Sequence, residues 1–390
     1  MFMKLNEQQA QAIEALRKWW YNGNKQVFQI SGAAGTGKTT LIRYLINEIK
    51  LEHDEVLFTA FVGKATLAMT RNGLNAKTLH SAICYCKDEP VLDENGNVVT
   101  EYNRRVTKRV FTRRRKIDPR IRLIVVDEGS MVPAKMADWL LKFKVPIIVL
   151  GDLNQLPPVI GDSFFLKEPD VVLTQIMRQS SESPIPYFAQ NVLQNGTKCL
   201  SPGLQIGDKI NVLSKADITP ELLKDYDVII CGTNKTRNNL NTYIRERIYG
   251  RTQEYPVIGD KLICRENDWT FSVDDVYLIN GLIGYVTDID LESISDYTMK
   301  IDFKPEFMDN EFKNVTLDRI YMGLSPNDKR FYRSNYHKFE YGYAITCHLS
   351  QGSQYNRVLV FNESFGTAEE RRKWLYTAVT RAIDKVTILI

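Results

Sequence analysis

The chain has 390 residues, of which 44% are hydrophobic and 25% are charged, and its net charge is +4. This composition excludes an intrinsically disordered chain, and the length favours two or more domains. No apolar run is long enough to cross a bilayer, and the N-terminus turns polar at once, unlike a secretory signal. We therefore expect a cytoplasmic protein that has no membrane partner.

The 6 cysteines are scattered along the chain rather than arranged in a framework. This favours free thiols in a reducing compartment. His80, Cys84 and Cys86 lie close together in sequence, but they lack a fourth ligand and match no zinc spacing. A metal site is therefore the weaker interpretation of this cluster.

The positive charge is concentrated in residues 104–122, which contain ten Lys or Arg residues and one Asp. The rest of the chain is therefore net acidic. A local basic segment on an acidic protein favours a polyanion partner, with nucleic acid as the first choice. A solvated basic loop, or a nuclear-import tract around Arg113–Lys116, is the alternative.

The first predicted elements are a helix, a strand, a glycine-rich loop and a second helix. Helical spacing of apolar residues predicts a helix over residues 5–21. A short strand over residues 25–32 runs into the glycine-rich loop, and helical spacing resumes over residues 39–50. Strand, loop and helix in this order form the context that a phosphate-binding loop requires.

The glycine-rich loop fits the complete phosphate-loop pattern. Its backbone amides and the following helix N-terminus favour phosphate oxygens. Lys38 should reach the terminal phosphates of ATP, and Thr39 should ligate Mg²⁺. The predicted nucleotide-binding residues of this segment are Gly32, Ala33, Ala34, Gly35, Thr36, Gly37, Lys38, Thr39 and Thr40.

Two continuous apolar runs, residues 121–131 and 145–155, end in polar residues and are typical of buried parallel strands. Ligand sites lie beyond the carboxyl ends of such strands, so Asp127, Glu128 and Gln155 should lie at the same edge as the phosphate loop. Asp127 fits a second contact to Mg²⁺, and Glu128 would orient or deprotonate the attacking water. A surface carboxylate pair is the alternative.

An insertion over residues 84–118 contains two β-favouring arms around Asn95-Gly96, which is a strong hairpin signal. The basic segment follows it directly. From residue 179 onward, apolar runs again predict buried strands, and shorter strands are predicted between them. The sequence therefore predicts two α/β layers with β-rich insertions.

Ten motifs occur in a defined order along the chain. They are LNEQQ (5–9), the phosphate loop, TAFVGKAT (59–66), TLH (78–80), DEGSM (127–131), GDLNQLPPV (151–159), LTQIMRQ (173–179), CGTN (231–234), YAITCHLSQGSQY (343–355) and LYTAVTRA (375–382). This set resembles superfamily 1 helicases of the RecD and Dda type. One such motif is weak evidence, whereas the ordered set is specific and covers most of the chain.

The resemblance implies an α/β fold with two RecA-like P-loop motor domains built on parallel sheets. The boundaries would be 1–83 and 119–178 for the first motor domain, 179–286 and 338–390 for the second, 84–118 for a β-hairpin pin insertion, and 287–337 for a small SH3-like β-barrel. We expect the aromatic residues of 307–312 and 328–343 to fill the barrel core rather than to close over a DNA strand.

The resemblance also implies roles around the nucleotide. Gln9 would read the adenine, and Gly352 would contact the nucleotide. Gln155 would sense the γ-phosphate, and Arg178 and Arg381 would be arginine fingers. A surface salt bridge is the alternative for each arginine. If Arg381 comes from the second motor domain, ATP would draw the two domains together, and hydrolysis would then become motion.

Contacts to a nucleic-acid strand would lie at the opposite edge of both motor domains and would be largely sequence-tolerant. The residues implied are Thr59, Lys64, Thr78, His80, Thr233, Asn234, Thr346 and His348, with Tyr102 and Phe111 of the hairpin as candidates for base stacking. His80 could instead pack in the interior, and the two aromatic residues could pack the hairpin's own core.

Our leading hypothesis is an ATP-dependent, Mg²⁺-using DNA helicase that moves 5′ to 3′ on single-stranded DNA and opens junctions between single and double strands. The polarity rests on the resemblance alone. An RNA-directed motor of the same superfamily and a non-motor adaptor subunit are the alternatives. We expect a monomer in the cytoplasm of a bacterium or a phage-infected host, with single-strand-binding, replication or recombination proteins as candidate partners.

Overall fold

The computed structural model describes residues 5–33, 35–61, 63–71, 73–93, 95–101, 104–105, 107–157, 163–176, 183–273, 276–306, 308–324, 329, 334–363 and 366–390. The chain forms two compact units. Unit 1 comprises Met1–Cys84, Arg113–Lys215 and Ser350–Ile390, and unit 2 comprises Tyr85–Thr112 and Ala216–Leu349.

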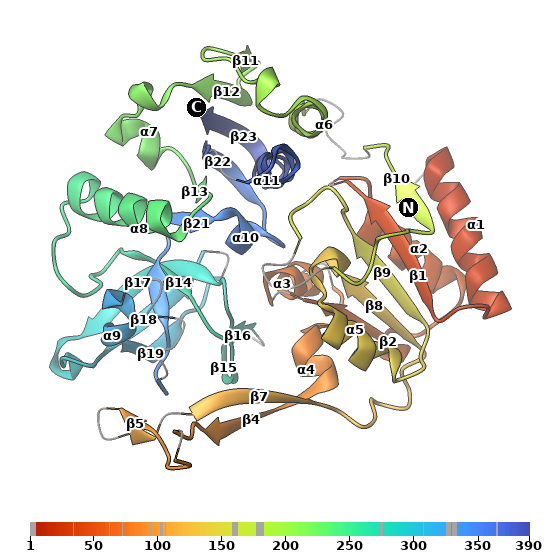
Figure 1. Ribbon diagram of the computed structural model, residues 1–390, viewed down its shortest axis with the longest axis horizontal. Coiled ribbons are helices and arrows are strands. Elements are labelled where there is room, and N and C mark those ends of the chain that lie inside the picture. Colours follow the sequence, from red (N-terminus) through yellow and green to blue (C-terminus); the bar gives the residue numbers. More distant parts are fainter. Residues whose placement is uncertain are drawn as a thin grey trace. The chain divides into compact units, whose positions relative to one another are not determined.

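Unit 1 contains a six-stranded parallel sheet in the order β10-β1-β9-β8-β2-β3 (Figure 1). Its strands are β1 Val27–Gly32, β2 Val56–Ala60, β3 Ala76–Thr78, β8 Leu123–Asp127, β9 Ile147–Gly151 and β10 Val171–Leu173. The predicted strands within 25–32, 121–131 and 145–155 are confirmed. In a parallel sheet their carboxyl ends share one edge, so the loops after β1, β8 and β9 meet there.

Five helices accompany this sheet: α1 Glu7–Asn22, α2 Lys38–Glu48, α3 Gly63–Arg71, α4 Leu79–Ile83 and α5 Ala134–Leu141. Helix α1 begins at a capping box formed by Asn6 and Gln9 and ends at Gly23, whose backbone is left-handed. Apolar residues of α1, α2 and α3 form one continuous core with the sheet, in which Leu16, Leu41 and Leu45 are fully buried. Because β1 and α2, the two elements that flank the phosphate loop, both contribute to this core, the core fixes the two ends of the loop.

The C-terminal part of unit 1 forms a second sheet segment in the order β11-β12-β23-β22. Its elements are β11 Gln205–Ile206, β12 Ile210–Leu213, β22 Tyr355–Phe361 and β23 Ala382–Leu389, with helices α6 Ile185–Asn195 and α11 Ala368–Val379. Strand β23 pairs in parallel with both β12 and β22. The predicted helix followed by a strand near the C-terminus is confirmed, and Arg381 lies between these two elements.

Unit 2 contains a five-stranded antiparallel sheet in the order β19-β18-β17-β14-β20. Its strands are β14 Lys261–Cys264, β17 Ile283–Asp290, β18 Thr298–Pro305, β19 Phe312–Asp318 and β20 Phe339–Tyr341. Phe303, Phe312 and Phe339 are fully buried, with ring centroids of Phe303 and Phe339 5.0 Å apart. The expectation that these aromatics fill a core is confirmed for Phe312 and Phe339, whereas the SH3-like barrel remains a prediction.

Helix α8, Asn234–Tyr243, and the π-helical turn Ile244–Ile248 are tied to this region of unit 2 by buried ion pairs. Asp260, fully buried, accepts hydrogen bonds from Arg245 Nε and Arg251 Nη1, each at 3.0 Å. Glu340 accepts one from Arg237 Nη2 at 3.1 Å. Removing one partner of these buried ion pairs would leave an uncompensated charge.

Unit 2 also contains the parallel pair of strands β13 Val228–Cys231 and β21 Ala344–Thr346.

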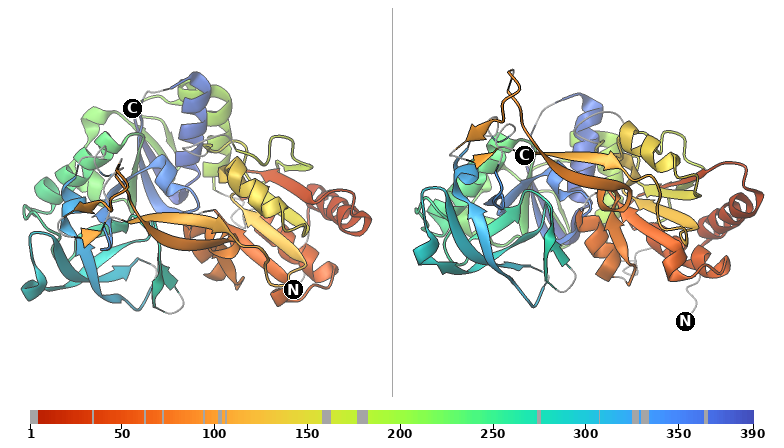
Figure 2. Two further views of the ribbon diagram at one scale, coloured as in Figure 1. Left: turned by 60° about the horizontal axis from the view of Figure 1, so that its bottom comes forward. Right: turned by 90° about the horizontal axis from the view of Figure 1, so that it is seen from below.

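The predicted hairpin insertion is a two-stranded ribbon of β4 Cys84–Pro90 and β7 Thr107–Arg113, which run side by side in every view (Figure 1, Figure 2). Strands β5 Thr100–Glu101 and β6 Arg104–Arg105 form a second small sheet. At the predicted turn, Leu92 pairs with Val98 and Gly96 has a left-handed backbone (φ 81°). The Asn95-Gly96 turn is confirmed, and it lies beyond the longer ribbon.

The basic segment that follows is partly used within the protein. Arg120 pairs with Asp118 and Asp54, and Arg122 pairs with Glu55. Arg114 Nε donates to the Cys84 carbonyl oxygen at 3.1 Å. The C-terminal part of the segment therefore has partners in the fold, and a nucleic-acid contact is expected from its N-terminal part.

The six cysteines, all of which lie in the described ranges, are thiols and not members of disulfide bonds, as predicted. Within the described ranges, no helix has both the length and the apolar character that crossing a bilayer requires.

Candidate active site

The phosphate loop follows β1 and ends at Gly37, the N-cap of α2, whose backbone is left-handed (φ 81°). The Thr36 hydroxyl donates to the Ala33 carbonyl oxygen at 2.9 Å. The Lys38 ammonium donates to the carbonyl oxygens of Gly32 and Ala33, at 2.6 and 3.1 Å. These partners are neutral, so the charge of Lys38 remains available to an anionic phosphate.

Gln9 lies against the phosphate loop. Its Nε2 donates to the Thr36 carbonyl oxygen at 3.2 Å, and a Cβ atom at Gly37 would lie 2.7 Å from the same nitrogen. The residue is 1% exposed. Helix α1 is therefore in direct contact with the loop, and adenine reading by Gln9 remains a prediction.

Gln8 has a role that the sequence analysis missed. Its Oε1 accepts hydrogen bonds from the backbone N–H groups of Thr174 and Gln175, both at 3.0 Å. Its Nε2 donates to the Thr174 hydroxyl at 2.8 Å. The side chain therefore fixes the segment after β10 to the start of α1. The doubled glutamine in LNEQQ is the one signal that could have indicated it.

Asp127 and Glu128 lie at the carboxyl end of β8. Glu128 has a left-handed backbone (φ 53°), which is uncommon for a residue with a side chain. Asp127 Oδ1 accepts a hydrogen bond from the Glu128 N–H at 2.9 Å. The next residue is Gly129, where a Cβ atom would lie 2.2 Å from Val149 Cγ1. This close approach to β9 leaves no room for a side chain directly after the two carboxylates, which accounts for the glycine at position 129.

The two carboxyl groups have raised pKa values. Burial and, next, the charge of Asp127 raise the pKa of Glu128 to about 7, whereas the charges of Arg381 and Lys38 act in the opposite direction. Burial also raises the pKa of Asp127, opposed by the charge of Lys38. A carboxyl group whose pKa is near the working pH suits a general base.

We expect kcat/KM for ATP hydrolysis to fall as the pH drops below about 7, because Glu128 must be ionised to accept a proton. The slope should approach about tenfold per pH unit. The measurement is strand-stimulated hydrolysis across this range, with strand binding measured at each pH as the control. An ordinary glutamate, with a pKa of about 4.3, would leave the rate flat near pH 6, and a flat profile would contradict the assignment. Glu128→Gln should be slow at every pH.

The loop after β9 carries Asp152 and Gln155, which are 1% and 6% exposed. Within the part of the chain that the structure describes, Gln155 Oε1 has no hydrogen-bond partner, and the same holds for Ser130 Oγ and Gln351 Oε1. A buried polar atom without a partner is costly. These three atoms therefore fit a site that is completed by a polar ligand such as a nucleotide.

Arg381 is 3% exposed. Its guanidinium donates to the Thr377 carbonyl oxygen at 3.1 Å, to the Ser353 carbonyl oxygen at 3.2 Å and to the Thr380 hydroxyl at 3.1 Å. Its charge lowers the pKa of Glu128, so the two side chains lie within electrostatic reach of each other in unit 1. A surface salt bridge, the alternative for this arginine, does not fit a buried side chain bonded to carbonyl groups.

The remaining nucleotide-site predictions stay predictions. Ala34 and Arg178 lie outside the described residues, and the side chain of Thr39 is not described. Thr40 is exposed in the first turn of α2. Gly352 has a left-handed backbone (φ 72°) just after α10, Cys347–Ser350.

Two predicted strand contacts in unit 1 are corrected. Thr59 is fully buried, and its hydroxyl donates to the Val125 carbonyl oxygen at 2.9 Å, between β2 and β8. It therefore cannot contact a nucleic acid from there, and that prediction is wrong. Thr78 is 3% exposed and is the N-cap of α4, where its Oγ1 accepts a hydrogen bond from the Ser81 N–H at 3.2 Å. Its hydroxyl caps a helix instead of meeting a phosphate.

His80 is half-buried, with its ring centroid 5.5 Å from that of Phe61. Burial lowers its pKa, so it is neutral near pH 7 and would meet a strand as a hydrogen-bond partner, not as a cation. The described residues bring no three His, Cys, Asp or Glu side chains together as a metal site. Lys64 lies in α3 with its side chain undescribed, Phe111 is half-buried in β7, and Tyr102 lies outside the described residues.

In unit 2, Thr233 and Asn234 are exposed at the start of α8, where the Thr233 hydroxyl accepts a hydrogen bond from the Thr236 N–H at 3.1 Å. Thr346 is 8% exposed at the end of β21 and offers little surface to a strand. His348 is half-buried, and burial lowers its pKa. Strand contact by these residues remains a prediction.

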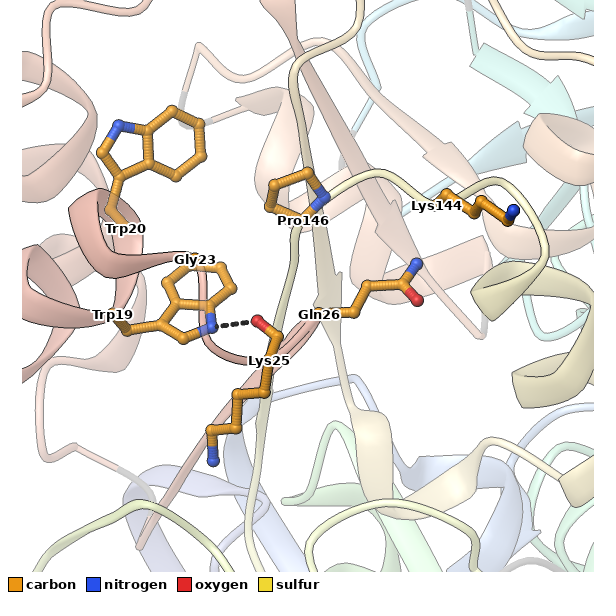
Figure 3. Close-up of a pocket in the computed structure, with 7 residues that line it drawn as sticks. All are labelled: Trp19, Trp20, Gly23, Lys25, Gln26, Lys144 and Pro146. Carbon is orange, nitrogen blue, oxygen red and sulfur yellow. Dashed lines mark hydrogen bonds between the residues drawn. The ribbon is translucent and has the colours of Figure 1, made fainter.

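An open pocket of about 300 Å³ lies apart from this site (Figure 3). It is lined by Trp19, Trp20, Gly23, Lys25, Gln26, Lys144 and Pro146. Gln26 directly precedes β1 and Pro146 directly precedes β9, so the pocket is at the amino ends of the strands, opposite the phosphate loop. It contains none of the predicted site residues.

The phosphate loop, the two carboxylates, the buried glutamine and the arginine define a P-loop nucleotide hydrolase. Residues 4–198 match the family model of an AAA domain, and residues 341–389 match the model of a UvrD-like helicase C-terminal domain. The chain belongs to superfamily 1 of the ATP-dependent DNA helicases, in the group that contains Pif1, RecD and Dda. The resemblance identified from the motifs is thereby confirmed.

Relatives of this group match at low identity. The ATP-dependent DNA helicase Pif1 of Campylobacter jejuni is 26% identical over 433 residues, which cover 93% of this chain and 88% of that protein. The ATP-dependent DNA helicase dda of Enterobacteria phage T4 is 26% identical over 292 residues, 68% of this chain and 62% of dda. The conjugal transfer protein TraA of Agrobacterium fabrum is 24% identical over 97% of this chain, which spans only 32% of TraA.

Solved Pif1 structures share the fold. A Pif1 structure on forked double-stranded DNA has a TM-score of 0.56 and 18% identity, covering 99% of this chain and 92% of that chain. Bacteroides Pif1 bound to single-stranded DNA has a TM-score of 0.54 and 16% identity, with the same coverage. This likeness confirms the predicted fold class of RecA-like α/β domains.

Proposed function

We propose that this helicase uses ATP hydrolysis to move 5′ to 3′ along single-stranded DNA and to separate the duplex at a junction. The observation that carries the proposal is the gathering of Lys38, Glu128 and Gln155 at one sheet edge, with Arg381 within electrostatic reach of Glu128. The helicase relatives of Campylobacter and phage T4 support ATP and DNA as its substrates. The direction of movement follows from membership of the Pif1, RecD and Dda group.

In the proposed reaction the protein supplies positioned charge around the γ-phosphate. Lys38 leaves its carbonyl partners in the loop and neutralises the terminal phosphates. Thr39 and Asp127 would hold Mg²⁺, which would supply positive charge to offset the negative charge that develops on the phosphate oxygens. Glu128, ionised above a pH of about 7, accepts the proton of the attacking water.

Two further residues complete the proposed site. Gln155 accepts a hydrogen bond from the attacking water at its unpartnered Oε1, which removes the cost of a buried, unpaired oxygen, and its Nε2 donates to the γ-phosphate. Arg381 stabilises the transition state as an arginine finger, a role that requires its Nη1 to exchange the Ser353 carbonyl oxygen for a phosphate oxygen while its Nε remains bonded to the Thr377 carbonyl oxygen. Arg178 is the second proposed finger.

Strand binding would be largely independent of base sequence. Lys64, Thr233 and Asn234 are the proposed contacts, together with the neutral imidazoles of His80 and His348. Contacts to the sugar-phosphate backbone position a strand without reading its bases. A monomer is the proposed unit. Single-strand-binding, replication and recombination proteins are the proposed partners.

The ribbon of β4 and β7, with its tip at Asp93–Val98, is the proposed pin that splits the duplex. We expect that replacing Asp93–Val98 by a short glycine turn leaves strand-stimulated ATP hydrolysis unchanged and lowers the unwinding rate at least about tenfold. The physical reason is that the tip contributes no residue to the phosphate loop, whereas its Val98, 38% exposed, pairs with the exposed Leu92 and offers an apolar surface to a base pair. The measurement is strand separation and hydrolysis on the same forked substrate.

Replacing Asn95-Gly96 by Asp-Gly is the matched control for the pin, because it keeps a two-residue turn that fits the same left-handed backbone. This variant should unwind normally. Unchanged unwinding after removal of Asp93–Val98 would exclude the tip as a pin.

The test of the proposed function is strand separation on two matched duplexes, one with a 5′ tail and one with a 3′ tail. Opening of only the 5′-tailed duplex is expected. Opening of only the 3′-tailed duplex would overturn the proposed 5′-to-3′ direction of movement. ATP consumption without opening of either duplex would indicate a translocase that does not separate strands. Equal stimulation of hydrolysis by RNA and DNA would overturn the DNA preference.

A further inference from the structure

The loop that carries Gln155 is held on both sides by the C-terminal segment of unit 1. The Leu156 N–H donates to Thr377 Oγ1 at 3.0 Å, and the Leu156 carbonyl oxygen accepts a hydrogen bond from Gln351 Nε2 at 2.9 Å. Both backbone polar groups of the residue after Gln155 are therefore bound by side chains from about 200 residues away. The loop cannot shift without breaking these bonds.

A third bond fixes the start of the same loop. The Tyr376 hydroxyl donates to Asp152 Oδ2 at 2.6 Å, and Asp152 Oδ1 accepts a hydrogen bond from the Asn154 N–H at 3.0 Å. Tyr376 and Asp152 are each 1% exposed. A short hydrogen bond to a carboxylate in a buried site is among the stronger ones. We call Gln351, Tyr376 and Thr377 together the loop clamp.

Thr377 also contacts the arginine. Its carbonyl oxygen accepts a hydrogen bond from Arg381 Nε at 3.1 Å, while its hydroxyl donates to the Lys373 carbonyl oxygen at 2.7 Å. Its side chain is 0% exposed. A single residue therefore bonds the loop of Gln155 through its hydroxyl and Arg381 through its carbonyl group.

We infer that Thr377 is a positioning residue for ATP hydrolysis, which sets the distance between the Gln155 side chain and the Arg381 guanidinium. The inference rests on the proposed roles of Gln155 and Arg381. Two catalytic groups on separate segments act together only if their separation is fixed, and an error of about 1 Å can cost on the order of 10²-fold in rate. The loop clamp supplies that constraint through named bonds.

A threonine inside a helix often bonds the carbonyl group four residues earlier, which would be a local structural role. Thr377 makes that bond to Lys373, so the local role is real. The bond to Leu156 is different, because in it Thr377 Oγ1 accepts a hydrogen bond from a buried backbone N–H in a loop 221 residues away. The experiment must therefore separate rate from stability.

The test begins with Thr377→Val, which keeps the shape and removes the hydroxyl. We expect kcat for strand-stimulated ATP hydrolysis to fall about tenfold, with the dissociation constants for ADP and for single-stranded DNA changed by less than about twofold. Thr377→Ser restores the hydroxyl and should recover most of the rate. A Thr377→Val enzyme with normal kcat, or one that serine fails to rescue, would overturn the inference.

The control for stability is Thr219→Val in unit 2. Thr219 is the N-cap of α7, Pro220–Lys224, and its Oγ1 accepts a hydrogen bond from the Leu222 N–H at 3.1 Å. Removing an N-cap hydrogen bond, like removing the Thr377 hydroxyl, lowers the stability of the fold, so this variant should lower the melting temperature without lowering kcat. If Thr377→Val does not fold, Tyr376→Phe tests the same clamp through the bond to Asp152.

A double-mutant cycle with Arg381→Ala decides whether Thr377 acts through the arginine. If it does, Thr377→Val changes kcat by less than about twofold in the Arg381→Ala background, because the arginine is already absent. A further full tenfold loss in that background would show independent effects and overturn the inference. Normal hydrolysis by Arg381→Ala alone would instead refute the proposed role of Arg381.

Discussion

Lys38→Ala abolishes measurable ATP turnover, with a loss of at least about 10²–10³-fold in kcat, as for the removal of one oriented charge donor at a developing anion. The ammonium of Lys38 is held 2.6 Å from the Gly32 carbonyl oxygen at the mouth of the phosphate loop. No other lysine follows β1 within the loop, so the charge has no substitute there. The measurement is phosphate release with saturating single-stranded DNA.

Strand binding by Lys38→Ala should persist and should weaken with rising salt, because phosphate contacts release counterions. Lys144→Ala is the matched control, since Lys144 is an exposed lysine at the opposite edge of the same sheet. The control should hydrolyse ATP at the normal rate. Normal turnover by Lys38→Ala would mean that the nucleotide does not occupy this loop.

Arg381→Ala lowers kcat by about 10³–10⁵-fold, the range for an arginine finger. The charge of Arg381 lowers the pKa of Glu128, so its guanidinium lies within electrostatic reach of the proposed general base. Arg381→Lys keeps a charge but loses the planar fork, so it should recover only part of the rate. The measurement is single-turnover hydrolysis, with ADP binding measured in parallel and expected to change little.

Arg120→Ala is the control for the arginine experiment. Arg120 is 66% exposed and pairs with Asp118 and Asp54 at the surface, where an ion pair contributes little. Its removal should leave kcat unchanged. A loss for Arg381→Ala no larger than that of Arg120→Ala would reduce Arg381 to a structural residue that holds Thr377, Ser353 and Thr380 together.

The strands and the phosphate loop could be predicted because they depend on local pattern. Strands β8 and β9 read as uninterrupted apolar runs, since both faces of a parallel sheet are covered. That same continuity explains the failure at Thr59. A strand without alternation does not reveal which way a side chain points, so a buried threonine and one facing a ligand look alike.

Other features depend on contacts between distant segments and could not be predicted. The left-handed backbone of Glu128 and the packing of Gly129 against Val149 occur where β8 and β9 come together, which only the sheet order determines. The bonds of Gln8 to the segment after β10 and of Thr377 to Leu156 join residues 166 or more positions apart. Thr78 is an exception, because a threonine before a short helix is a readable capping signal.

The strand order of the first sheet also has a consequence for synthesis of the chain. Strand β1 pairs only with β9 and β10 in this sheet, although β9 begins about 120 residues later, at Ile147. At translation rates of about 5–20 residues per second, β1 waits on the order of ten seconds for a partner. Until β9 has been synthesised, the apolar segment of β1 lacks both of the neighbours that it has in this sheet. The sheet edge that carries the phosphate loop can therefore form only after Gly151 has been added to the chain.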